Sequence, residues 1–175
     1  PYAADIERIR AAFNTDSTAQ KEKLRSALRD TTFVMVVDTG DGKEYVAKPG
    51  EVYIASDRLK QLFASVDGVL IVDNEYECLR GEDIRDLLVA CGASRYLSPE
   101  SSSSGLSSAE KAQIRKEAGL ERACWEFLVD DFTIRGLAQF LKLLPDLQPI
   151  EARVRAGVLW DALADLEGRG SAAFY

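Results

Sequence analysis

A β-forming run that leads directly into turn residues limits the folds open to this chain. Residues 31–37 are rich in β-branched and aromatic side chains and are predicted to form a buried strand. The next five residues, 38–42, are rich in aspartate and glycine, which is typical of a tight turn. Residues 44–48 are predicted to return as a second strand. The sequence therefore predicts a hairpin at 38–42 and a sheet that is mostly antiparallel.

Further strands and helices complete a predicted α/β unit over residues 1–97. Short strands are expected at 52–54 and 69–72, and helices at 3–13, 18–29, 58–64 and 82–91. The helix over 82–91 has the clearest periodicity, because Ile84, Leu87, Leu88 and Cys91 follow the spacing of one buried helix face. Gly92 follows as the residue that ends the helix.

A second, mostly helical part is predicted for residues 106–175. It follows a Ser-rich stretch, 98–105, that we expect to be a mobile loop or linker. Helices are expected at 107–118, 133–144 and 150–167, with a strand at 125–129. Within the last helix, Val154, Val158, Leu159, Ala162 and Leu166 are expected to face inward, and Trp160 is expected in the core. The predicted fold class is α+β: a small mixed, mostly antiparallel sheet with flanking helices, then a mostly helical C-terminal part.

Composition excludes several classes of function. The net charge of −7 argues against a nucleic-acid surface or an anionic-membrane surface, because both need positive charge. The absence of histidine removes His-containing triads and His metal sites. Three widely spaced cysteines are interpreted as buried thiols of a cytoplasmic protein. No membrane segment, metal or cofactor is predicted, and a chain that starts Pro1-Tyr2 is expected to be a piece of a longer protein.

The segment Val36-Val37-Asp38-Thr39-Gly40 is the sharpest motif with a chemical meaning. Two apolar residues before Asp-Thr-Gly are typical of retropepsin-like aspartic proteases, in which two such aspartates share a proton across a dimer. The alternative is a plain hairpin turn, which suits Asp41-Gly42 better and is the preferred interpretation. In that case Asp38→Asn is expected to change stability by no more than about 0.5 kcal/mol.

Acidic residues gather in residues 73–86, against only two arginines, Arg80 and Arg85. Three interpretations are open: a solvated acidic face, a docking face for a basic protein partner, or a divalent-metal site. Negative charge in the first turns of the helix that begins near residue 82 also stabilises its positive dipole end. The candidate interaction face consists of Asp73, Glu75, Glu77, Glu82, Asp83 and Asp86.

Several short segments together resemble a known family. In the first unit they are residues 28–34, the Pro-Gly-Glu-Val-Tyr-Ile-Ala element at 49–55, Leu59 with 62–63, 72–76, and 84–88 with 91–93; later they are 106–110, 116–119, 131–137, 158–160 and 170–174. Their order is similar to a segment of the large bacterial sacsin-like proteins, which carry a GHKL-type ATPase module elsewhere in the chain. The resemblance covers nearly all 175 residues.

The resemblance implies an internal, non-catalytic region of an ATP-dependent, chaperone-like protein. It implies other domains of the parent protein, or a protein client, as partners. The asparagine and glycine boxes that bind ATP in GHKL ATPases do not occur here, so no catalytic or ATP-binding residue is assigned by match. We therefore expect a structural and interaction module that is not itself an enzyme. The Asp38 hydrolase and the acidic docking face are the alternatives.

Overall fold

The computed structural model describes residues 1–97, 99–102, 105–119 and 131–169. Its main sheet has four strands, β1 (Val34–Asp38), β2 (Glu44–Ala47), β3 (Val52–Tyr53) and β4 (Leu70–Val72), in the order β2-β1-β4-β3. Strand β1 runs antiparallel to β2 and β4, whereas β3 and β4 are parallel. The predicted hairpin between β1 and β2 is confirmed, and so is the predicted α+β fold class.

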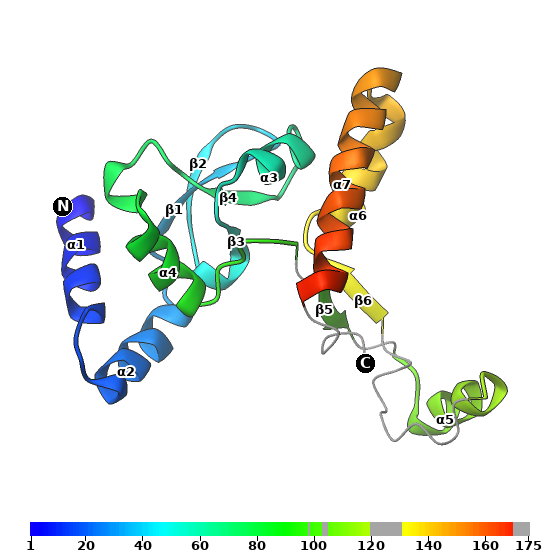
Figure 1. Cartoon of the computed structure of the whole chain (residues 1–175), viewed down its shortest axis with the longest axis horizontal. Coiled ribbons are helices and arrows are strands. Elements are labelled where there is room, and N and C mark those ends of the chain that lie inside the picture. The colour runs from blue at the N-terminus through cyan, green and yellow to red at the C-terminus, as the bar shows by residue number, and fades with distance from the viewer. Residues whose placement is uncertain (98, 103–104, 120–130, 170–175) are drawn as a thin grey trace.

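Three helices and the sheet enclose the first hydrophobic core. They are α1 (Tyr2–Phe13), α2 (Thr18–Arg29) and α4 (Glu82–Ala90), which lie together on one side of the sheet in Figure 1. Each helix contributes a buried side chain to this core, such as Ile6, Leu28 and Leu87, and β1 contributes Val34 and Val36. The periodicity predicted for α4 is confirmed, because Ile84, Leu87, Leu88 and Cys91 are all buried.

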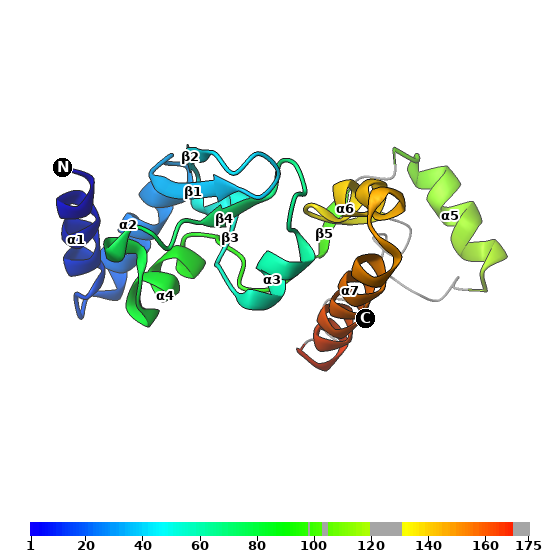
Figure 2. The same ribbon diagram turned by 90° about the horizontal axis from the view of Figure 1, so that it is seen from above.

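A second core lies on the other side of the sheet. It contains side chains from α3 (Asp57–Leu62), α6 (Leu137–Leu143) and α7 (Pro149–Arg169), and α3 contacts α7 directly. Strand β3 serves both cores, since Val52 belongs to the first and Tyr53 to the second. This alternation follows from the two-residue period of a strand. The sheet therefore joins the C-terminal helices to the N-terminal unit (Figures 1 and 2).

Four residues of the stretch 98–105, which was predicted to be a loop, form a strand instead. Residues Pro99–Ser102 form β5, which pairs antiparallel with β6 (Asp131–Ile134). Ladder hydrogen bonds use backbone groups, so the polar residues of β5 can pair when a partner strand is available. The predicted helix at 133–144 accordingly starts later, at Leu137, after β6 and Gly136. Residues 98 and 103–104 and the predicted strand at 125–129 lie outside the described residues.

Serine side chains cap three of the helices. Ser17 accepts a hydrogen bond from the N–H of Gln20 at the start of α2, and Ser56 accepts one from Leu59 at the start of α3. Ser107 and Glu110 form a capping box at the start of α5 (Ser108–Glu117), as their spacing predicts. Within the described part of the chain, no helix has both the length and the apolar character needed to cross a membrane.

Candidate functional site

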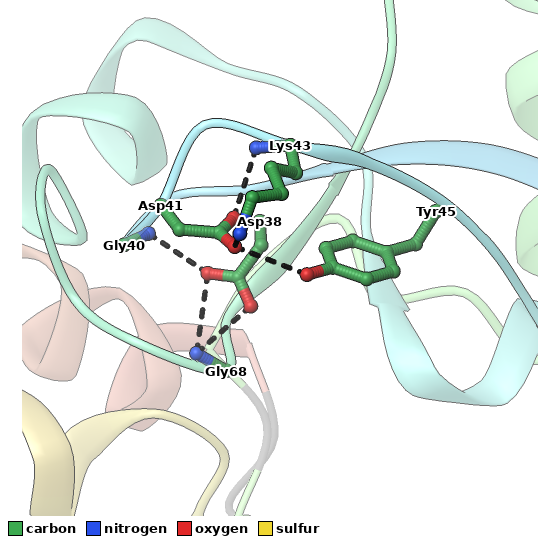
Figure 3. Close-up of polar contacts among 6 residues, drawn as sticks. All are labelled: Asp38, Gly40, Asp41, Lys43, Tyr45 and Gly68. Carbon is green, nitrogen blue, oxygen red and sulfur yellow. Dashed lines mark hydrogen bonds and ion pairs between the residues drawn. The ribbon is translucent and has the colours of Figure 1, made fainter.

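The carboxylate of Asp38 is held by backbone N–H groups from two loops. The N–H of Gly40 donates to Oδ1 at 2.8 Å, and the N–H of Gly68 donates to Oδ1 and Oδ2 at 3.2 and 3.1 Å. Figure 3 shows both glycine nitrogens directed at this carboxylate. Asp38 is half-buried at the end of β1, between β2 and β4. It therefore does more than cap its own turn, because it also fixes the loop that leads into β4.

Thr39 and Gly40 bind the same loop. The hydroxyl of Thr39 donates to the carbonyl of Val66 at 2.7 Å, and its N–H donates to the carbonyl of Val69 at 3.0 Å. A Cβ atom on Gly40 would lie 2.6 Å from the Cα of Asp67, so only glycine allows this approach. The Asp-Thr-Gly motif thus has a structural role at the junction of β1 and β4, beyond the plain turn that the sequence favoured.

The neighbouring Asp41 belongs to an exposed polar group on the hairpin. Its Oδ2 accepts hydrogen bonds from Nζ of Lys43 at 2.8 Å and from the Tyr45 hydroxyl at 3.0 Å (Figure 3). The hydrogen bonds from Lys43 lower the pKa of the Asp41 carboxyl. Ion pairs at such exposure contribute little to stability.

We expect Asp38→Asn to lower the free energy of unfolding by about 1–3 kcal/mol, because hydrogen bonds to a charged acceptor are lost. This replaces the near-neutral effect that the sequence suggested. The asparagine NH₂ would face the Gly68 N–H, where the carboxylate now accepts. Urea denaturation followed by circular dichroism measures the change. Asp41→Asn is the matched control on the same hairpin, and equal effects of the two variants would contradict a junction role for Asp38.

The six acidic residues of the candidate interaction face do not form one unpaired surface. Arginines from other segments pair with three of them: Arg10 with Asp83, and Arg95 with both Glu82 and Asp86. These contacts lower the pKa values of Asp83 and Glu82. A charge count over 73–86 misses this compensation, because Arg10 belongs to α1 and Arg95 follows α4.

Of the other three acidic residues, one is buried and two are exposed. Asp73 is buried, and its Oδ1 accepts a hydrogen bond from the N–H of Glu75 at 2.8 Å. Glu75 and Glu77 are exposed. Among the described residues, no group of three Asp, Glu or Cys side chains has the geometry of a metal site. Of the six acidic residues, Glu75 and Glu77 are therefore exposed, whereas Glu82, Asp83 and Asp86 are paired with arginines.

The two described cysteines, Cys78 and Cys91, are free and buried. Burial raises the pKa of both thiols, which disfavours the thiolate that a nucleophile or a metal ligand requires. Cys124 lies outside the described residues. These thiols act as small apolar groups of the first core.

A hollow of about 310 Å³ lies between α3, residues 95–97 and α7. Leu59, Leu97 and Ala162 are its buried apolar residues, and an ion pair between Arg58 and Asp165 joins α3 to α7 beside it. The hydroxyl of Ser56, which lines the hollow, accepts a hydrogen bond from the N–H of Leu59 as the cap of α3. The ion pair and the helix cap at this hollow both stabilise the fold, and neither one indicates a catalytic site.

The outward face of α7 is the feature that the sequence interpretation missed. Three large apolar side chains on it are open to solvent: Ile150 is 82% exposed, Trp160 73% and Val154 47%. The expected core positions of Trp160 and Val154 are wrong, whereas Ala162 is buried and Val158 and Leu159 are half-buried as expected. The apolar spacing on this helix fits more than one face, so periodicity alone did not separate the buried face from the exposed one.

Comparisons with protein-family models, with curated proteins and with solved structures found no match to this chain.

Proposed function

We propose that this chain is a non-catalytic protein-interaction module whose contact surface is the outward face of α7. The observation that carries the proposal is the exposure of Ile150, Val154 and Trp160 on one helix. Isolated exposed apolar residues are common, but several large ones on one element mark interaction sites. Tryptophan is among the residues that contribute most to binding when a partner buries it.

The polar groups of the described residues support a role without catalysis. Backbone donors hold Asp38, the thiols of Cys78 and Cys91 are buried, and arginines neutralise Glu82, Asp83 and Asp86. General acid–base or nucleophilic chemistry needs a side chain that is free to reach a substrate. The same arginine contacts weigh against docking of a basic partner on the acidic face.

The context that we propose is a larger, ATP-dependent, chaperone-like protein of the cytoplasm. Support comes from the sequence resemblance to bacterial sacsin-like proteins, in which the ATPase module lies elsewhere in the chain. In this context the module would couple the ATPase to another domain or to a protein client. The buried, unpaired thiols of Cys78 and Cys91 suit a reducing compartment.

Site-specific photo-crosslinking tests the contact surface. A photoreactive phenylalanine analogue at Val154 is expected to crosslink to protein when α7 is a contact surface, because this side chain lies on the exposed face. Crosslinked products are identified by gel shift and mass spectrometry, both for the purified chain and in cells that make the parent protein. The matched control is the same analogue at Lys23, which is exposed on α2 among polar residues. Equal crosslinking at the two positions, or none at Val154, would contradict the proposal.

A further inference from the structure

We propose that the partner of the α7 face is a second copy of this chain, whose α7 packs antiparallel across a two-fold axis at Gly157. The inference rests on the proposed function and adds the identity of the occupant. A symmetric interface of this kind uses the same patch on both copies, so the patch must be complementary to itself. Three properties of the described residues on α7 meet this requirement.

The first property is a glycine in the middle of the exposed face. Gly157 is an exposed residue inside α7, and a Cβ atom built on it would have no heavy atom within 4 Å. Glycine inside a helix is less favourable than alanine by about 1 kcal/mol, and no contact with the part of the chain that the structure describes explains it here. A glycine on an exposed helix face lets another backbone approach closely. At the two-fold axis, Gly157 would face its own copy.

The second property is the match of apolar side chains about that glycine. In an antiparallel pair centred on Gly157, residues at equal distances before and after it lie opposite each other. Val154 then lies opposite Trp160 of the second copy, and Ile150 lies opposite Ala164 of the second copy. The exposed large side chains are thereby buried against one another, and the small Ala164 leaves room for Ile150. Each contact occurs twice, once on either side of the axis.

The third property is the match of charge. Arg153 lies four residues before Gly157 and Asp161 four residues after it, so the pairing sets Arg153 opposite Asp161 of the second copy. Both side chains are exposed, and within the described ranges neither one forms an ion pair. Opposite charges at an interface favour the correct register, whereas like charges in these positions would oppose it. The same helix face is therefore complementary to itself in shape, apolarity and charge.

Charge reversal tests this pairing directly. The wild-type chain is expected to show a concentration-dependent dimer by sedimentation velocity and light scattering. Arg153→Asp places two acidic residues opposite each other, and Asp161→Arg places two basic ones. Each single variant should weaken the dimer at least tenfold, while the double variant R153D/D161R should regain it. An equimolar mixture of the two single variants should form a heterodimer, because every acidic pair then faces a basic one.

Helicity and thermal unfolding of each variant check that the fold is intact, since the changes are on an exposed face. Ile150→Glu provides a second route to the same loss of dimer. A wild-type chain that stays monomeric over the concentration series would overturn the proposal, and so would single charge variants that dimerise as well as wild type. If Val154 crosslinks to a different protein while the chain itself is monomeric, α7 is an interaction surface but its partner is not a second copy. If Val154 crosslinks to no protein, both the interaction surface and the second copy are rejected.

Discussion

Replacing Arg155 by methionine is expected to lower the free energy of unfolding by about 2–5 kcal/mol, because the charged guanidinium donates hydrogen bonds to two carbonyl groups that would then lack their donor. Arg155 is 3% exposed, and its guanidinium reaches the end of α3 from the middle of α7. Nη2 donates to the carbonyls of Leu62 and Ala64 at 2.9 and 2.5 Å. Methionine fills similar volume but donates no hydrogen bond, so these carbonyls would lose their partner inside the protein.

The same guanidinium connects three helices. It lies over the ring of Phe140 from α6, at 5.3 Å from the ring centroid, and Nη1 pairs with Glu151 one turn earlier on α7 at 3.2 Å. Its removal should therefore loosen α3, α6 and α7 together. Chemical denaturation gives the free energy, and hydrogen exchange at α3 locates the loss. Arg8→Met is the control, because its exposed ion pair with Asp5 should contribute less than about 0.5 kcal/mol. A loss below about 1 kcal/mol for Arg155→Met would contradict this role.

Two features of residues 1–97 were predictable because residues close together in the sequence determine them. The hairpin between β1 and β2 follows from its turn residues, and α4 follows from one clear apolar stripe that ends before Gly92. Neither feature needs information from distant residues. The antiparallel pairing of β1 with β4 and the parallel pairing of β3 with β4 depend on contacts between segments far apart in the chain. Only a mixed, mostly antiparallel sheet was therefore predictable.

Long-range partners explain why the site analysis failed where it did. Asp38 was interpreted as a turn residue because the Gly68 N–H that it binds lies 30 residues away. The acidic cluster was judged without Arg10, which pairs with Asp83 from α1. On α7, hydrogen bonds to carbonyls at the end of α3 keep Arg155 in the protein interior. The helix face that carries Arg155 therefore packs inward, and Trp160 on another face is exposed to solvent. A buried arginine cannot be recognised from spacing, since arginine is usually exposed.

Replacing Leu87 by alanine is expected to cost about 2–5 kcal/mol of stability, from lost apolar burial and from the cavity left behind. Leu87 is 1% exposed and lies in the first core, where α4 contacts α1. The control is Val89→Ala, two residues further along the same helix and 36% exposed, for which we expect a much smaller loss.

The comparison separates burial from helix propensity, because both variants place alanine on α4, and alanine favours a helix at least as well as leucine or valine. Denaturant midpoints with unchanged slopes would show that the loss concerns the folded state rather than the unfolded chain. A loss below about 0.5 kcal/mol for Leu87→Ala would mean that α4 does not pack on the sheet as the structure has it. The expected result shows that Leu87 of α4 stabilises the first core by its burial. Charge variants at Arg153 and Asp161 are instead expected to change association without unfolding the chain, because both side chains are exposed.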